Sequence, residues 1–120
     1  MDNFSGYVIA TKLLVENKRK VRFMYREQPL SEHDSGWRFS CGTETPEYYG
    51  DPANSALYNI STIIEIDPSI QPYLNADINT AFGRDSDNDA FQVLDDFEFS
   101  HYPELLKADE AHKISQQIEL

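Results

Sequence analysis

The residues of this chain best suited to chemistry form a short acidic run, Asp85-Ser86-Asp87-Asn88-Asp89. Alternate carboxylates at this spacing can converge on one calcium ion, and Asp96 falls at the twelfth position of such a loop. Ala90, however, stands where the loop needs a glycine, and an aspartate is too short to copy the usual bidentate glutamate. The run is therefore interpreted as a solvated turn, with a metal site as the weaker alternative.

The other reactive side chains show no spacing typical of an active site. The three histidines, His33, His101 and His112, do not form an HExxH motif or a comparable ligand pattern. Cys41 has Ser40, Gly42 and Glu44 as neighbours, none of which would favour a thiolate nucleophile. The sequence therefore predicts no enzyme, no catalytic residue, no bound metal and no cofactor.

Composition limits the compartment and the class of partner. The chain has 120 residues and a formal net charge of −11, and a phosphate backbone would repel such a field, so nucleic acid is excluded as a ligand. Its N-terminus lacks the charge pattern of a signal peptide, and no apolar run is long enough to span a membrane. A single cysteine excludes an internal disulfide and indicates a reducing compartment, which we expect to be the cytoplasm.

The charge is unevenly distributed along the chain. Residues 1–26 contain six basic and two acidic residues, whereas Arg84 is the only lysine or arginine between Arg38 and Lys107. One interpretation is that the basic segment packs beside the acidic remainder and that the excess charge serves solubility. The other is an acidic surface for a cationic protein partner, which would gain association rate from the field. The candidate contacts are the acids of the later loops, Asp85, Asp87, Asp89, Glu44, Glu47 and Asp51.

Three segments in the first third of the chain have strand patterns. Residues 6–10 are a short apolar run, and residues 21–26 alternate with period two, which predicts one buried face. A polar turn at residues 17–20 predicts that these two strands pair as a hairpin. Residues 37–41 alternate again, with Trp37, Phe39 and Cys41 directed to the core. The opposite face is then expected to carry Arg22, Met24, Arg26 and Arg38.

The later elements are shorter. Residues 43–56 are expected to be loop because of their proline, glycine and asparagine content. Residues 61–66 fit a short helix capped by Asn59 or Ser61, although their β-branched run leaves a strand as the alternative, and residues 67–74 fit one or two helical turns.

The acidic run is flanked by strand patterns at residues 80–84 and 90–94, which predict a second hairpin. From Pro103 onward, apolar residues recur at three- and four-residue spacings and predict a C-terminal amphipathic helix. The fold class is therefore α+β, with a mainly antiparallel, twisted sheet of about five strands and one or two short helices. Residues 1–97 are expected to form one domain, and residues 98–120 a helical extension of it.

The segment from Phe23 to Gly42 contains the only tryptophan and the only cysteine. Trp37 fits a core position, although tryptophan and arginine also dominate binding hot spots. Arg26 and Arg38 are expected to pair with Glu27 and Asp34 and to brace the turn between their strands, with partner binding as the alternative.

Six blocks of sequence, spread over residues 7–94, resemble the immunity protein 33 family of bacterial polymorphic-toxin systems, long catalogued as a domain of unknown function. The signature block contains Arg26, Glu27, Asp34, Ser35, Gly36, Trp37 and Arg38. In full, the six blocks are Ile9-Ala10-Thr11-Lys12, Phe23-Met24-Tyr25-Arg26-Glu27 with Pro29, Asp34-Ser35-Gly36-Trp37-Arg38-Phe39 with Gly42, Tyr48 with Asp51-Pro52-Ala53-Asn54, Asp67-Pro68-Ser69-Ile70 with Pro72-Tyr73-Leu74, and Ala81-Phe82 with Arg84-Asp85.

The resemblance implies an α+β domain that neutralises a cognate toxin by binding it, without catalysis. Because the signature block also fits a core corner of the fold, the acidic loops that follow it are the better candidates for the contact surface. A small-molecule or metal-binding regulatory domain, acting through the acidic run or a pocket under Trp37, is the alternative function.

Overall fold

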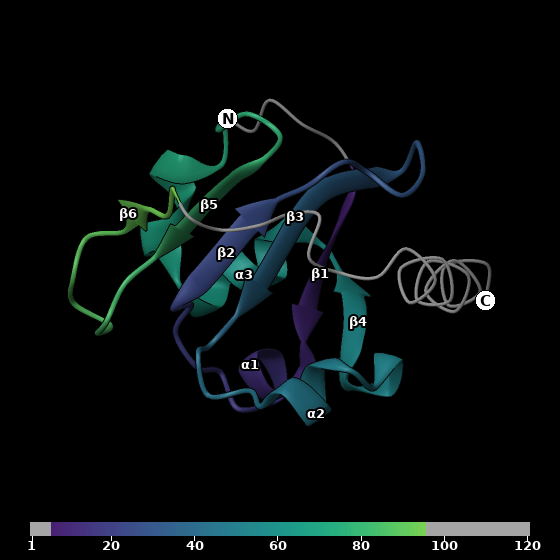
Figure 1. The fold of residues 1–120 in the computed structure, drawn as a ribbon, viewed down its shortest axis with the longest axis horizontal. Helices are drawn as coiled ribbons and strands as arrows, with labels where there is room; N and C mark the ends of the chain where they lie inside the picture. The colour runs from purple at the N-terminus through teal and green to yellow at the C-terminus, as the bar shows by residue number, and fades with distance from the viewer. Residues whose placement is uncertain (1–5, 96–120) are drawn as a thin grey trace.

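The computed structural model describes residues 6–95, which fold into one twisted sheet with short helices around it (Figure 1). The predicted C-terminal helix and the segment 98–120 lie outside the described residues. In chain order the helices and strands are β1 (Tyr7–Thr11), α1 (Lys12–Glu16), β2 (Phe23–Arg26), β3 (Asp34–Ser40), α2 (Pro46–Tyr49), β4 (Ser55–Tyr58), α3 (Ile60–Ile66), β5 (Thr80–Gly83) and β6 (Gln92–Val93), with 3₁₀ turns at Pro52–Asn54 and Pro68–Tyr73.

The six strands are ordered β4-β1-β3-β2-β5-β6. All neighbouring pairs are antiparallel except β1 and β3, which are parallel. The mainly antiparallel α+β prediction is confirmed, as is the hairpin of β5 and β6, but the predicted hairpin of β1 and β2 is wrong. Thr11 ends β1 and caps α1 by accepting a hydrogen bond from the Leu14 amide, and β3 lies between the two strands.

The register of β2 against β3 decides which side chains face the core. Met24 is opposite Phe39, and Tyr25 is opposite Arg38. Met24 is fully buried together with Trp37 and Phe39, so Arg38 lies on the other face of the sheet. The predicted core positions of Trp37, Phe39 and Cys41 are confirmed, whereas the expectation that Arg38 shares a face with Arg22, Met24 and Arg26 is wrong.

The segment expected to be loop, residues 43–56, contains short helices and the start of β4. Thr45 caps α2 with its side chain, and Asp51 caps the following 3₁₀ turn in the same way. Each cap is followed directly by a proline, which favours the first position of a helix. The proline and polar residues that suggested loop are therefore the residues that begin these turns. The alternative of a strand at 61–66 is wrong, since α3 covers Ile60–Ile66 with Asn59 at its N-cap position.

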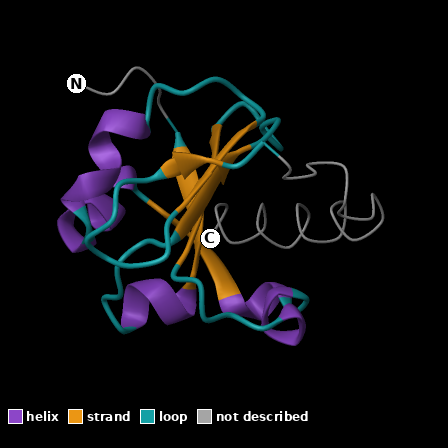
Figure 2. Ribbon diagram, turned by 60° about the vertical axis from the view of Figure 1, so that its left-hand side comes forward, coloured by secondary structure: helices purple, strands orange, loops and turns teal. Residues whose placement is uncertain are grey.

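The core lies between one face of the sheet and the helical layer formed by α3 and the 3₁₀ turn Pro68–Tyr73 (Figure 2). Trp37 is at its centre, stacked against Phe39 and Phe82, and its indole nitrogen donates to the carbonyl of Leu74 at 3.1 Å. Burying this ring while its one polar atom is hydrogen-bonded avoids the cost of an unsatisfied donor.

Within residues 6–95, no helix has the length and apolar composition needed to cross a membrane.

Candidate functional site

The six acids predicted to contact a partner all lie in segments that connect strands at the same end of the sheet. Thr11 is opposite Ser55, and Phe23 is opposite both Ser40 and Gly83. The loops that follow β1, β3 and β5 therefore meet those that precede β2 and β4. We call this the charged end, and it comprises the loops 17–22, 41–54 and 84–91.

The strand order divides these acids into two groups. Asp85, Asp87 and Asp89 are next to β6 at one edge of the sheet, and Glu47 and Asp51 precede β4 at the other edge. Five strand spacings of about 4.8 Å separate the two edges by about 24 Å. The exposed basic loop 18–20 comes between them, because it leads into β2. The structure therefore contains two acidic patches and not one continuous acidic face.

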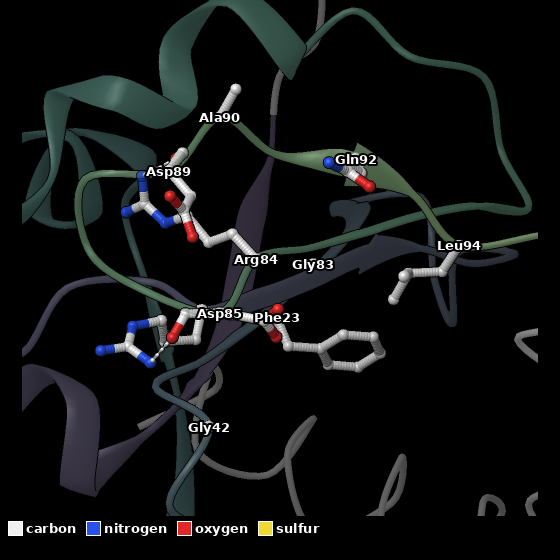
Figure 3. Close-up of a pocket in the computed structure, with 10 residues that line it drawn as sticks. Phe23, Gly42, Gly83, Arg84, Asp85, Asp89, Ala90, Gln92 and Leu94 are labelled. Atoms are coloured by element: carbon white, nitrogen blue, oxygen red, sulfur yellow. Dashed lines mark hydrogen bonds between the residues drawn. The ribbon is translucent and has the colours of Figure 1, made fainter.

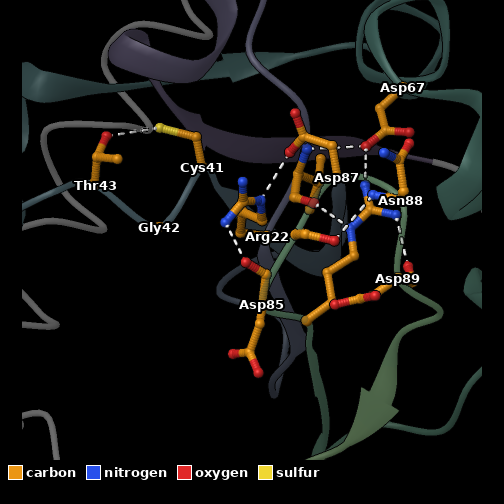
Figure 4. A network of polar contacts seen from close by, with 12 residues as sticks. Arg22, Cys41, Gly42, Thr43, Asp67, Asp85, Asp87, Asn88 and Asp89 are labelled. Carbon is orange, nitrogen blue, oxygen red and sulfur yellow. Dashed lines mark hydrogen bonds and ion pairs between the residues drawn. The ribbon is translucent and has the colours of Figure 1, made fainter.

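Arg22 holds two residues of the acidic turn, Asp85 and Asp87 (Figure 4). Its Nε donates to Asp87 Oδ1 at 2.7 Å, and its Nη1 donates to the backbone carbonyl of Asp85 at 2.8 Å. The hydrogen bond from Arg22 is the main cause of a lowered pKa at Asp87. Asp87 is thus engaged within the protein, although its side chain is half exposed.

Arg84 fixes the same turn from inside the protein. Its Nη2 donates to the buried carboxylate of Asp67 at 2.7 Å, while its Nε and Nη1 donate to the carbonyls of Val21 and Asp89. Its guanidinium lies 4.2 Å from the centroid of the Phe91 ring. Asp67 also accepts hydrogen bonds from the Val21 amide and from Ser69, so one carboxylate connects three segments of the chain.

Asp85 and Asp89 are the exposed acids that remain available at this turn. Within residues 6–95, the carboxylates of both residues make no hydrogen bond or ion pair. Two arginines against four aspartates, Asp67 included, leave this turn with two unneutralised negative charges. The turn is therefore a preformed, negatively charged surface whose backbone is held by arginine.

A cavity of about 740 Å³ opens beside this turn (Figure 3). Its lining combines both arginines and two of the aspartates with apolar side chains and exposed backbone, namely Arg22, Phe23, Gly42, Gly83, Arg84, Asp85, Asp89, Ala90, Gln92 and Leu94. Gly42 has φ +88°, and a β-carbon there would lie 3.0 Å from the Arg22 side chain. The predicted pocket under Trp37 is not this cavity, because Trp37 is fully buried in the core.

Glu44, which follows β3, and the two acids of the second patch have different roles. The Glu44 carboxylate accepts hydrogen bonds from the Thr11 hydroxyl and from the amides of Cys41 and Gly42, so it stabilises the loop after β3. Asp51 uses its carboxylate to cap the 3₁₀ turn, while Glu47 is exposed on α2 and makes no side-chain hydrogen bond among the described residues.

No three histidine, cysteine, aspartate or glutamate side chains converge as a metal site anywhere in residues 6–95. Cys41 is buried, with its sulfur 3.3 Å from the Thr43 hydroxyl (Figure 4). His33 is exposed beside Glu32, and the other two histidines lie outside the described residues.

The family-signature residues form a buried network away from the charged end. Arg38 donates to Glu27 Oε2 at 2.6 Å and to both carboxylate oxygens of Asp34, at 2.7 and 2.9 Å. Burial acts to raise the pKa of Asp34, but the hydrogen bonds and charge of Arg38, with the amides of Leu30 and Gly36, hold that pKa below its ordinary value. The expected bracing by Arg38 is confirmed.

The rest of the signature block supports this network. Gly36 has φ +91°, and a β-carbon there would be 2.4 Å from the carbonyl oxygen of Glu27. The Ser35 hydroxyl accepts a hydrogen bond from the Trp37 amide. Arg26 donates to the carbonyls of Ser35 and Ala76 and lies 5.9 Å from the Trp37 ring.

Sequence reasoning missed the two arginines that hold the acidic turn. The sequence pattern places Arg22 on a strand face and identifies Arg84 as an isolated cation within a family-matching block, but it assigns neither residue a partner. The isolation of Arg84 in a long acidic segment was a signal that it forms an ion pair. Many acids were possible partners, and the one it pairs with, Asp67, is 17 residues away in the sequence. Which acid it selects depends on the fold.

Comparison with known proteins identifies a family for the chain. The family model described as the immunity protein Imm33 domain matches residues 8–94. Neither the curated proteins nor the solved structures include a significant match to the chain.

Proposed function

The chain belongs to the Imm33 immunity protein family, and we propose that it binds a cognate toxin and neutralises it by occupying the toxin's functional surface. The observation that carries this proposal is the acidic turn at the charged end, where Asp85 and Asp89 are exposed and Asp87 is held by Arg22. Occlusion needs only tight binding, so the proposal assigns no catalytic step to the chain.

The electrostatics support a basic protein as the partner. A net charge of −11 steers a cationic partner toward the chain, and fixed carboxylates at the contact set the orientation. Because Arg22 and Arg84 hold the turn in place, binding would require little ordering of the loop, which reduces its entropic cost. We place this binding in the cytoplasm, where the buried single cysteine stays reduced.

A co-expression experiment tests the proposal in cells. The toxin encoded by the adjacent gene is expressed with the unaltered chain or with one of two variants. The test variant, Asp85→Asn/Asp89→Asn/Glu47→Gln, removes exposed charges at the charged end. The control, Glu32→Gln/Asp77→Asn/Glu65→Gln, removes exposed charges outside the loops of the charged end. Each changes the net charge from −11 to −8, so only the position of the lost charges differs.

We expect the unaltered chain and the control variant to rescue growth and the test variant to lose rescue. Exposed, isosteric substitutions change the stability of a protein little, so loss of rescue would report binding. If the unaltered chain fails to rescue, the immunity function is wrong. If all three proteins rescue equally, the immunity function stands and the role of the acidic end is wrong.

A second candidate function is a small-molecule-binding regulatory domain, and it rests on the cavity beside Arg22 and Arg84. Its volume is in the range of ligand pockets, about 300–1,000 Å³. A thermal-shift screen of anionic and zwitterionic metabolites tests this candidate. A rise in melting temperature that is lost in Phe23→Ala would support it, and no shift with any compound would remove it.

A further inference from the structure

The outer edge of β6 is open beside the acidic turn. β6 is the last strand in the sheet order, and on its outer side no strand pairs with it among residues 6–95 (Figure 1). Both of its residues are exposed, and Val93, at 57%, is more exposed than Ile78, the other large apolar residue among residues 6–95 that is neither buried nor half-buried. An open edge with an exposed apolar residue can accept another strand.

The hydrogen-bond pattern shows which backbone groups this edge offers. The Leu94 amide donates to the Ala81 carbonyl, and Val93 is opposite Phe82. In an antiparallel pair the bonded and non-bonded positions alternate, so the amide and carbonyl of Val93 point away from β5. Val93 therefore presents one donor and one acceptor outward, in the arrangement that an added strand uses.

Charge identifies the strand that fits this edge. Asp85 and Asp89 are at the start of β6 and Asp95 is just past its end, and all three are exposed. A second copy of this chain, paired in either direction, would bring aspartates against aspartates, which disfavours self-association. A segment with lysine or arginine near each end would meet opposite charges instead.

The cavity extends the same site to side chains. Gln92 and Leu94 line it, and alternation along β6 puts Val93 on the other face of the strand. Every second side chain of an added strand would then lie on the cavity side. A long basic side chain there could approach the carboxylates of Asp85 and Asp89, with its methylene groups against Phe23 and Leu94.

We propose that an extended, basic segment of the toxin adds to the sheet as a strand along the outer edge of β6. This inference rests on the proposed immunity function and specifies how the partner is bound. The backbone bonds at Val93 supply part of the affinity, and the aspartates at the two ends of β6 select for cationic residues in the added strand.

Binding of the purified toxin domain from the adjacent gene, measured by calorimetry, tests the edge. Val93→Pro removes the outward amide without removing a bond inside the sheet, because proline is tolerated where an edge strand faces solvent. We expect its dissociation constant to rise by about tenfold or more, through the lost bond and the clash of the ring with an added strand. Val93→Thr keeps the amide and should bind within about threefold of the unaltered chain. Ile78→Thr, at the other exposed apolar site, should bind unchanged.

Hydrogen exchange of the unaltered chain gives a second measurement that does not depend on a proline variant folding. The Val93 amide should exchange rapidly in the free protein and at least about tenfold more slowly in the complex. Tight binding with an unchanged Val93 exchange rate would overturn strand addition while leaving the immunity function intact. Failure of the unaltered chain to bind the toxin at all would overturn both.

Discussion

Replacing Arg38 tests whether the signature residues stabilise the fold. In Arg38→Met a side chain of similar length fills the space, but Asp34 and Glu27 lose the cation between them. The Asp34 side chain is fully buried and that of Glu27 is 9% exposed, so water can replace little of the lost interaction. Removing one partner of a buried ion pair costs about 3–5 kcal/mol.

Such a loss is large compared with the whole stability of a small domain, about 5–15 kcal/mol. With a urea m-value of about 1.5 kcal/mol/M, the unfolding midpoint should fall by about 2–3 M. The fluorescence of Trp37, the only tryptophan and fully buried, reports the transition. Arg22→Met is the matched control, because its ion pair has a similar length, 2.7 Å, but is half exposed and should cost less than about 1 kcal/mol.

The pH dependence gives a second readout. Because Arg38 holds the pKa of Asp34 below its ordinary value, this pair stabilises the fold above the unfolded-state pKa of about 3.9, and that stabilisation is lost as the pH falls through the folded-state pKa. In Arg38→Met the buried, charged carboxylate of Asp34 has lost its cation. Protonation of Asp34 at low pH removes this charge and so restores part of the lost stability. The difference in free energy of unfolding between the unaltered chain and Arg38→Met should therefore be largest near pH 7 and should narrow toward pH 4. Equal midpoints for Arg38→Met and Arg22→Met would refute this reasoning.

Three further outcomes follow from the same contacts. Gly36→Ala should lower stability by more than about 2 kcal/mol in urea unfolding, because φ is +91° and the new β-carbon would meet the Glu27 carbonyl. At an m-value of about 1.5 kcal/mol/M this is a midpoint shift of about 1.3 M or more, and a shift below about 0.5 M would contradict it. Glu44→Ala should lower the free energy of unfolding by about 1–3 kcal/mol, because the Cys41 and Gly42 amides lose their acceptor. Its toxin affinity should change less than about threefold. A large loss of affinity at full stability would instead make Glu44 a contact residue. Calorimetry with millimolar calcium or magnesium should show no heat, and a saturable signal lost in Asp87→Asn would restore the metal interpretation of the acidic run.

The core was largely predictable from the sequence, because period-two alternation fixes which residues share a face of a strand. Trp37, Phe39 and Cys41 were assigned in this way, and the β5–β6 hairpin followed from two strand patterns around an acidic turn. The face of β2 was not predictable in the same way. Both of its alternating sets include apolar residues, and only the pairing of Met24 with Phe39 shows which set is buried.

The order of the strands could not be predicted, because it depends on contacts between distant segments. Thr11 ends β1 and caps α1, so the chain leaves the sheet there instead of forming a hairpin with β2, and a local pattern suggests this cap only weakly. The candidate site has the same limitation. Its acids were visible in the sequence, but the division into two patches and the engagement of Asp87 by Arg22 arise from the topology.

The affinity of the purified toxin domain for the two triple variants tests the central claim most directly. At low salt, removing three exposed carboxylates from the charged end should raise the dissociation constant by about tenfold or more, at roughly 0.5 kcal/mol for each contact. The control variant, which loses three charges outside the charged end, should bind within about twofold of the unaltered chain. Equal affinities for both variants and the unaltered chain would contradict a toxin-binding surface at the charged end.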